Sequence, residues 1–360
     1  MTLKWLAFYL AALTFPLLLS LVFTPLVRRA ALRRGFMDRP KSEAHKQQSA
    51  PVALGGGMAL MAAFITCLAL GAAIAAIHPA VREELALKLN LELCMKRGAV
   101  LASAALAAGL LGLTDDLRPL KAWAKFLGQF AIAFAAVEFG GAKLSLFLPW
   151  PWLTAVVSVF WFVFVINAIN FFDNMDGLAS GAIAIAMLCF AVIAIMNRQF
   201  LTASAALGVM GLTTGFWAFN RAPATIYLGD SGSHFLGFLT ALVTVFVTYF
   251  HAGSNSFFPV AAPLVALAPI LTDAITVCVI RTLHRKPFWI GDNNHLSHRF
   301  TQMGLSRPQA VNCVHMLCFA FGCGALALVW GNLATTAAVI TQSAALVGFI
   351  IYLQKVSRRA

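Results

Sequence analysis

Long runs of apolar residues, separated by short polar segments, follow one another along the whole chain. About eleven of these runs approach the roughly 20 residues that an α-helix needs to cross a bilayer. They cover residues 5–24, 53–77, 98–113, 122–138, 153–172, 178–196, 199–218, 233–250, 259–281, 309–330 and 333–353. The first run continues into an arginine cluster without a cleavage site, so we interpret it as a retained span. The pattern predicts an all-α, polytopic transmembrane helical bundle, with residues 1–360 forming one integral-membrane domain.

Composition and charge predict the orientation of this bundle across the membrane. Hydrophobic residues make up 61% of the chain and charged residues only 11%, which leaves no water-soluble domain. With the N-terminus outside, 19 of the 26 Lys and Arg residues lie on the cytoplasmic side, as the positive-inside rule requires. The same rule explains the net charge of +13, so we expect no nucleic-acid partner. The C-terminus is then cytoplasmic, and cysteines without a C-x-x-C pair indicate neither disulfides nor zinc.

Four polar side chains at a spacing of three close the fifth run: Asn167, Asn170, Asp173 and Asp176. A regular helix would turn the first and the last of them to opposite sides, so we expect the helix to end here. Asp176-Gly177 suits a turn and the start of the next helix. Oxygen ligands at this density suit a hard cation such as Mg²⁺, and polar groups in membrane segments are candidates for function. A solvated helix end is the alternative.

Further ionisable groups fall on the same cytoplasmic side. Asp115-Asp116 suit a general base or a group beside a metal, with a solvated turn as the alternative. Gly229-Asp230 opens the eighth run, where glycine permits close approach to a ligand. His295 and His298 are spaced to contact one phosphate or sugar together, unless they are ordinary surface histidines. Because hydropathy and charge alone set the topology, this convergence predicts one shared site.

These motifs together resemble the polyprenyl-phosphate N-acetylhexosamine-1-phosphate transferase family, also described as glycosyltransferase family 4. The resemblance runs in the family's order over nearly the whole chain, through Asp38-Arg-Pro, Gly55-Gly-Gly, Leu113-Thr-Asp-Asp, Asn167 to Leu178, Gly229-Asp-Ser-Gly-Ser and the histidine loop. It implies transfer of a sugar 1-phosphate from a UDP-N-acetylhexosamine to undecaprenyl phosphate, with release of UMP. The expected place is the cytoplasmic face of the bacterial inner membrane, among membrane lipid, at the first membrane step of cell-envelope polysaccharide synthesis.

The resemblance also implies dependence on Mg²⁺, with Mn²⁺ as a substitute, and a role for each motif. Asn170 and Asp230 would hold the metal, Asp173 and Asp176 would lie near the nucleotide, and Asp115 or Asp116 would deprotonate or position the lipid phosphate. The remaining expected contacts to substrate are Lys46, Lys125, His295 and His298. A direct transfer and a covalent aspartyl intermediate both stay open, as do the downstream polymer and a homodimer.

Two departures from the family pattern bear on the donor sugar. The family's H-x-H-H appears as His295-Leu-Ser297-His298, and we expect the serine to widen the donor pocket and remove a hydrogen-bond donor. The first cytoplasmic loop has Glu43-Ala-His45-Lys instead of an Arg-Lys-His run. Eleven spans and a basic inner tail are similar to the N-acetylglucosamine branch, so UDP-N-acetylglucosamine is the expected donor.

Three other classes of protein fit the sequence less well. A CDP-alcohol phosphotransferase would share Asp173-x-x-Asp176-Gly177, but Ser180 stands where that family has arginine. An intramembrane aspartyl protease would need G-x-G-D, whereas Tyr227-Leu228 precede Gly229-Asp230. An ion-coupled transporter would place its carboxylates near the middle of the membrane. Here they gather at the inner ends of spans, which favours an enzyme acting at the interface.

Overall fold

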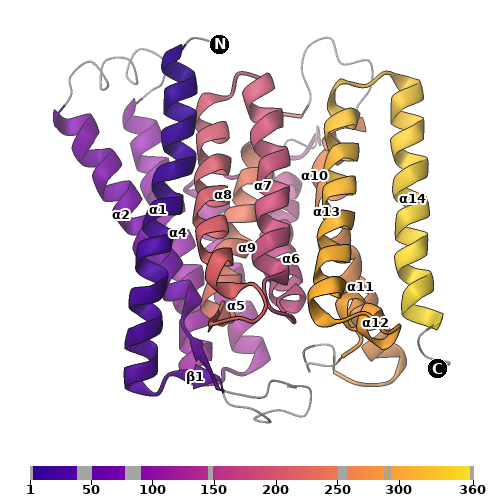
Figure 1. Ribbon diagram of the computed structural model, residues 1–360. Helices are drawn as coiled ribbons and strands as arrows, with labels where there is room; N and C mark the ends of the chain where they lie inside the picture. The colour runs from indigo at the N-terminus through magenta and orange to yellow at the C-terminus, as the bar shows by residue number, and fades with distance from the viewer. Residues whose placement is uncertain are drawn as a thin grey trace.

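The computed structural model describes residues 3–38, 51–77, 91–144, 149–249, 258–287, 289 and 293–356. Its helices stand side by side as a bundle (Figure 1), which confirms the all-α membrane class. The first half contains α1 Leu3–Arg34, α2 Gly56–Ile77, α4 Leu91–Leu117, α5 Ala122–Glu138, α6 Pro151–Phe172 and α7 Leu178–Met196. The second half contains α8 Phe200–Asn220, α9 Gly229–Phe246, the 3₁₀-helix η1 Phe258–Ala261, α10 Ala262–Ala266, α11 Ala268–Leu283, α12 Leu296–Gln302, α13 Arg307–Trp330 and α14 Leu333–Val356.

Each of the eleven expected runs contains helix, but the helices differ in how well they could span a membrane. Among the described residues, eight are long and apolar enough, and the bent pair formed by 258–266 and 268–283 would be a ninth. The remaining two expected spans correspond to α5, of 17 residues, and to α9, which begins with polar residues. The number of spans therefore stays a prediction.

Helix α4 is longer than its apolar run. The run at 98–113 predicts a short span, whereas the helix extends over Leu91–Leu117. Asp115 and Asp116 consequently lie in the last turn of a helix and not in the loop beyond it. A helical last turn fixes the directions of both carboxylates, which a loop would not.

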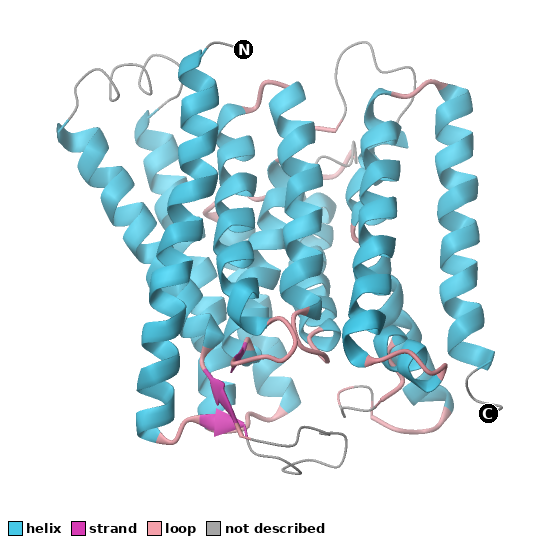
Figure 2. Ribbon diagram, in the orientation of Figure 1, coloured by secondary structure: helices cyan, strands magenta, loops and turns pink. Residues whose placement is uncertain are grey.

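A three-stranded sheet at one end of the bundle was not expected (Figure 2). Strand β1 Met37–Asp38 pairs antiparallel with β2 Val52–Leu54, which pairs parallel with β3 Ile226–Tyr227. Strands of two or three residues are too short to show an alternating pattern, so periodicity could not reveal them. The sheet attaches the segment that follows α1 to the segment that enters α9.

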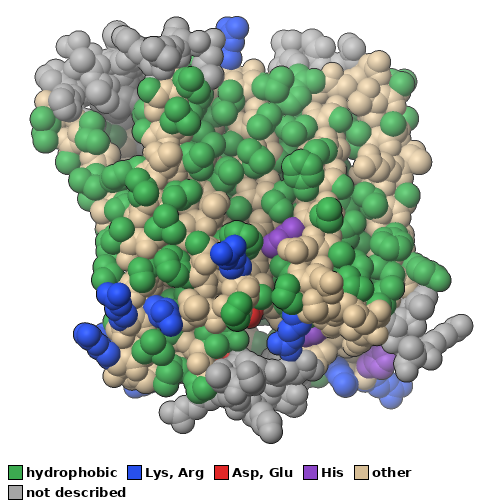
Figure 3. Space-filling view, in the orientation of Figure 1, with side chains coloured by type: hydrophobic (Ala, Val, Ile, Leu, Met, Phe, Trp, Pro, Cys, Tyr) green, Lys and Arg blue, Asp and Glu red, His purple; other side chains and the backbone are tan. Residues whose placement is uncertain are grey.

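The two ends of the bundle differ in charge. Helix α1 begins at the upper end in Figure 1 and α14 ends at the lower end, as an odd number of spans requires. On the face shown in Figure 3, most of the Lys and Arg side chains lie in the lower half. We call this end, where α1 finishes at Arg34 and α9 begins at Gly229, the basic end. Its position agrees with the predicted cytoplasmic side.

Glycines let three helices meet in backbone contact at the basic end. A Cβ added to Gly57 of α2 would lie 2.3 Å from the backbone nitrogen of Gly232. One added to Gly112 of α4 would lie 2.1 Å from the carbonyl oxygen of Asp230. Any side chain at these positions would force the helices apart. The close approach brings the last turn of α4 against the first turn of α9.

Candidate active site

The α6–α7 turn has the form that the spacing of polar residues predicts. Helix α6 ends at Phe172, and the backbone nitrogen of Asp173 closes it on the carbonyls of Ile169 and Asn170. Gly177 precedes α7 with a φ of +73°, a conformation that favours glycine. The predicted end of the helix is confirmed, and it leaves Asp173 and Asp176 in a turn at the basic end.

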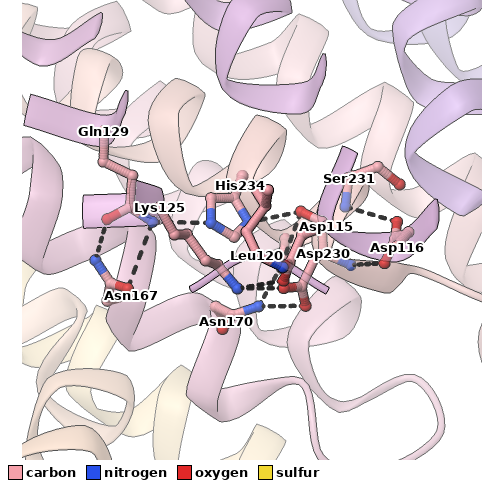
Figure 4. A network of polar contacts seen from close by, with 11 residues as sticks. Asp115, Asp116, Leu120, Lys125, Gln129, Asn167, Asn170, Asp230, Ser231 and His234 are labelled. Carbon is pink, nitrogen blue, oxygen red and sulfur yellow. Dashed lines mark hydrogen bonds and ion pairs between the residues drawn. The ribbon is translucent and has the colours of Figure 1, made fainter. Parts of the chain in front are cut away.

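Lys125 joins two carboxylates that are distant in sequence (Figure 4). Its ammonium donates to Asp115 Oδ2 at 2.8 Å and also bonds to Asp230 Oδ2. Asp115 Oδ1 accepts from the backbone nitrogen of Leu120 at 2.6 Å. The side chains of Lys125, Asp115 and Asp230 are 18%, 16% and 29% exposed, so a substrate at the interface can reach them.

Asn170 bonds to the Asp230 carboxylate from a fourth helix, α6. Its amide nitrogen donates to Asp230 Oδ1 and to Ser233 Oγ, each at 2.9 Å. The amide oxygen of Asn170 therefore lies on the side away from these contacts (Figure 4). The two predicted metal ligands are thus neighbours, although 60 positions separate them in the chain.

Asp116 has a different environment from Asp115, although the two are adjacent in sequence. Its oxygens accept from the backbone nitrogens of Asp230 at 2.8 Å and Ser231 at 3.0 Å. It therefore caps the positive end of α9 from another helix. A Cβ at Gly229 would lie 2.8 Å from Asp116 Oδ2, so glycine is needed for this approach. We call Asp115, Asp116, Lys125, Asn170 and Asp230 the carboxylate centre.

Asp173 and Asp176 lie beside this centre in the α6–α7 turn. Burial raises the pKa of Asp173 to about 8, with further contributions from the charges of Asp230, Asp116 and Asp176. Asp176 Oδ2 accepts from the backbone nitrogen of Ala224 at 2.9 Å. Crowded carboxylates of this kind favour a bound cation.

The predicted histidines are buried, not exposed on a surface loop. His295 is 4% and His298 is 9% exposed, and their ring centroids are 6.4 Å apart. Asp273 of α11, itself 1% exposed, bonds to His295 Nδ1 at 2.7 Å and to the backbone nitrogen of Leu296 at 2.6 Å. This carboxylate holds the start of α12, a role that no motif in the sequence indicated.

Ser297, which the sequence predicts to widen a donor pocket, is itself buried, so its expected placement is wrong. It is 1% exposed and its hydroxyl donates to Asn174 Oδ1 at 2.5 Å. The serine therefore links α12 to the α6–α7 turn. Lys46 lies outside the described residues, and its expected phosphate contact stays a prediction. We call residues 295–302 the histidine segment.

Several polar residues near the site, buried or half-buried, were given no role in the site by sequence reasoning. They are Gln129, Asn174, Ser233, His234, Asp273 and His315. The Nε2 atom of His315, in the middle of α13, lies 3.0 Å from the carbonyl oxygen of Leu178 at the start of α7. A signal existed for some of them, because a polar residue within an apolar run is costly unless it has a partner. The partner itself could be identified only in the fold.

The donor atoms of the centre fit a hard divalent cation. Within the described residues no group of three or more His, Cys, Asp or Glu side chains could hold a metal ion by itself. Mg²⁺, however, is usually held by one or two protein oxygens together with substrate phosphates. Asp230 offers one such oxygen, the Asn170 amide beside it would offer a second after turning, and the ammonium of Lys125 shows that this position attracts positive charge.

Comparison with known proteins assigns the family. A model described as glycosyl transferase family 4 matches residues 98–248. The probable undecaprenyl-phosphate N-acetylglucosaminyl 1-phosphate transferase of Bacillus subtilis is 30% identical over 87% of this chain and 82% of its own length. The chain belongs to glycosyl transferase family 4. The resemblance noted in the sequence is thereby confirmed.

Other relatives, which match a shorter part of the chain, carry another name. The phospho-N-acetylmuramoyl-pentapeptide-transferase of Limosilactobacillus fermentum is 32% identical over 56% of this chain and 64% of its own length. That of Bacillus licheniformis is 30% identical over 63% of this chain and 70% of its own length. The family match at 98–248 contains every residue of the carboxylate centre and ends before the histidine segment.

Proposed function

We propose that the protein transfers N-acetylglucosamine 1-phosphate from UDP-N-acetylglucosamine to undecaprenyl phosphate at the cytoplasmic face, with release of UMP. The observation that carries this proposal is the junction of Lys125 with Asp115 and Asp230 at the basic end of a family 4 bundle. A partly exposed charged centre at the end of apolar helices suits one substrate from the lipid and one from water. The name of the Bacillus subtilis relative supports the choice of sugar and lipid.

Asp230 and Asn170 would hold the divalent cation, Mg²⁺ or Mn²⁺, together with oxygens of the diphosphate. When bound, the ion would neutralise charge that builds on the departing UMP. Asp230 is already oriented by two partners, Lys125 and Asn170, which reduces the reorganisation needed on binding. Turning the Asn170 amide would present its oxygen, with Ser233 as a neighbouring partner.

Asp115 is our candidate for the group that accepts the proton of the lipid phosphate or positions it. One of its oxygens already holds an ammonium, and a phosphate entering beside Lys125 would meet both charges. Asp116 suits this role less, because its oxygens are engaged by the backbone of α9. We therefore assign Asp116 to holding the first turn of α9, and through it Asp230.

The donor would lie between the α6–α7 turn and the histidine segment. Asp173 and Asp176 would face the nucleotide, and His295 and His298 would contact phosphate or sugar. Ser297 ties the two elements together through Asn174, so it would set their separation without touching the sugar. The residues that contact the sugar and select among UDP-sugars would then be His298 and those of the first cytoplasmic loop around Lys46.

An assay of purified protein in detergent tests the proposal. UMP release should require UDP-N-acetylglucosamine, undecaprenyl phosphate and a divalent cation, and a chelator should stop it. Lys125→Gln should lower turnover about 100-fold or more, because it removes a charge-stabilising group. Lys143→Gln is the matched control, since Lys143 pairs with Glu138 at the far end of the same helix. Uptake of substrate into vesicles without UMP release would instead favour a transporter.

The cytoplasmic placement can be tested separately. In a variant without its native cysteines, a single cysteine at the exposed Arg118 should react with a membrane-impermeant thiol reagent only from the inside. A cysteine at Lys143, 40% exposed, should react only from the outside. The reverse labelling pattern would show the opposite orientation in the membrane, with the site on the outer face and away from cytoplasmic UDP-sugars.

A further inference from the structure

A second polar layer lies one helical turn deeper in the bundle than the carboxylate centre. The three helices that carry Lys125, Asn170 and Asp230 each supply a second polar side chain: Gln129 on α5, Asn167 on α6 and His234 on α9. Gln129 is 1% and His234 is 0% exposed. Polar groups in such surroundings are costly unless they are hydrogen-bonded, so the arrangement of this layer is informative.

The donor and acceptor roles in this layer follow from one contact, to a backbone carbonyl. The Nδ2 atom of Asn167 donates to the carbonyl oxygen of Val163 at 2.7 Å, and a carbonyl can only accept. This sets the orientation of the Asn167 amide, whose Nδ2 also donates to Gln129 Oε1 at 2.6 Å. The nitrogen of Gln129 must then face His234, and it lies 2.8 Å from His234 Nε2 (Figure 4).

This order determines the proton on the His234 ring. An amide nitrogen is only a donor, so His234 Nε2 must accept and carries no hydrogen. The ring proton is on Nδ1, which donates to the carbonyl oxygen of Asp230 at 2.7 Å. His234 is therefore neutral, and it adds no charge beneath the ammonium of Lys125.

We infer that His234 is a positioning residue for the reaction. As the neutral Nδ1–H tautomer, it fixes the peptide of Asp230 to α5 and α6 through Gln129 and Asn167. The carboxylate of Asp230 is thereby held where Lys125 and Asn170 meet it. This role rests on the proposed function and deepens it, because the residue acts on the group that would bind the metal.

An aliphatic side chain at position 234 would break the layer at two points. It would leave the nitrogen of Gln129 with only its longer contact to Asn167 Oδ1, at 3.4 Å, and the Asp230 carbonyl without the Nδ1 donor. The first turn of α9 would still be capped by Asp116, so the helix should persist while Asp230 loses its fixed orientation. A loss of orientation behind a metal ligand typically costs 10- to 100-fold in metal affinity or activity.

Two variants separate this positioning from packing. His234→Leu removes both hydrogen bonds of the ring. Gln129→Glu keeps the size of the side chain, and its ionised carboxylate cannot donate, so in that state His234 Nε2 gains a proton and the ring becomes positive one turn below Asp230. Both should raise the Mn²⁺ dissociation constant on the order of 10-fold. We would measure Mn²⁺ binding by electron paramagnetic resonance on the purified protein with UMP present, which needs no turnover.

In the transfer assay the same variants should lower kcat more than they change KM for UDP-N-acetylglucosamine. His234→Asn should recover part of the loss, because its amide nitrogen can replace Nδ1 as donor to the Asp230 carbonyl. Thr244→Val is the matched control. Thr244 is buried on the same helix and accepts from Trp161 Nε1 of α6 at 2.9 Å, so its loss should lower Tm and leave Mn²⁺ binding within about twofold.

The outcomes distinguish this inference from the proposed function. Wild-type Mn²⁺ affinity in both His234→Leu and Gln129→Glu, with only Tm lowered as in Thr244→Val, would overturn the positioning role. A wild-type protein that binds Mn²⁺ with UMP but releases no UMP from any UDP-sugar would overturn the proposed function. The Mn²⁺ comparison between variants would still decide the role of His234.

Discussion

The carboxylate centre and the histidine segment both gather ionisable groups at the basic end, but these groups are held in different ways. In the centre, the side chain of Lys125 bonds to those of Asp115 and Asp230, so these three charged groups are partners of one another. In the histidine segment, His295 is held by Asp273 of another helix, and Ser297 by Asn174. A change within the centre therefore disturbs several site groups together, whereas the histidine segment can be moved by residues outside its motif.

The largest effect should come from Asp115→Asn within the centre. The amide keeps the size of the carboxylate but removes the proton acceptor, so kcat should fall by about 10² to 10⁴. KM for the UDP-sugar should change little, since the donor does not depend on this charge. Glu138→Gln at the other end of the bundle is the control, and equal losses in kcat and in donor affinity would remove the division of roles.

Asp230→Asn should follow, with turnover lowered on the order of 10² to 10³. The change weakens the contacts with Lys125 and Asn170 and removes the charge that would hold the metal. Raising the Mg²⁺ concentration should restore part of the activity, because a neutral amide oxygen is a weaker ligand and not an absent one. Full turnover at low Mg²⁺ would exclude Asp230 from the metal site.

Asp273→Asn tests the other side of the comparison. The carboxylate bonds to both His295 and the backbone nitrogen of Leu296, and an amide presents only one oxygen to them. We expect a loss of about 1–3 kcal/mol in stability from the unpaired group, visible as a lower Tm. KM for the UDP-sugar should rise several-fold while kcat changes less. A fall in kcat as large as that of Asp115→Asn would place the histidine segment in the chemical step.

Ser297→Ala should have the smallest effect of the series. It removes one hydrogen bond, to Asn174, which contributes about 0.5–1.5 kcal/mol, and should raise KM for the donor slightly. Ser297→His would instead overfill a buried position and cost about 1–3 kcal/mol. A changed ranking of UDP-sugars in either variant would show that this position reads the sugar after all.

The sequence alone predicted the features that depend on local pattern. Long apolar runs predicted the helical membrane class, and the spacing from Asn167 to Asp176 predicted the end of α6, because a regular helix would turn these two side chains to opposite sides. Motif order indicated the family and most of the candidate site residues. The short sheet was not predicted, because strands of two or three residues are too short to show an alternating pattern and depend on their neighbours for stability.

Only the tertiary structure decided which polar groups are partners. Nothing in the local sequence distinguishes Asp115 from Asp116, yet Asp115 bonds to Lys125 and Asp116 caps α9. The cap is possible because glycines at 57, 112 and 229 let α2, α4 and α9 pack closely together. Asp273, Ser297 and His234 depend on contacts with distant helices, so no motif could assign them. A polar residue in an apolar run indicates that a hydrogen-bond partner is needed. Which residue is that partner, and which of the two donates, is decided by the packing of the helices.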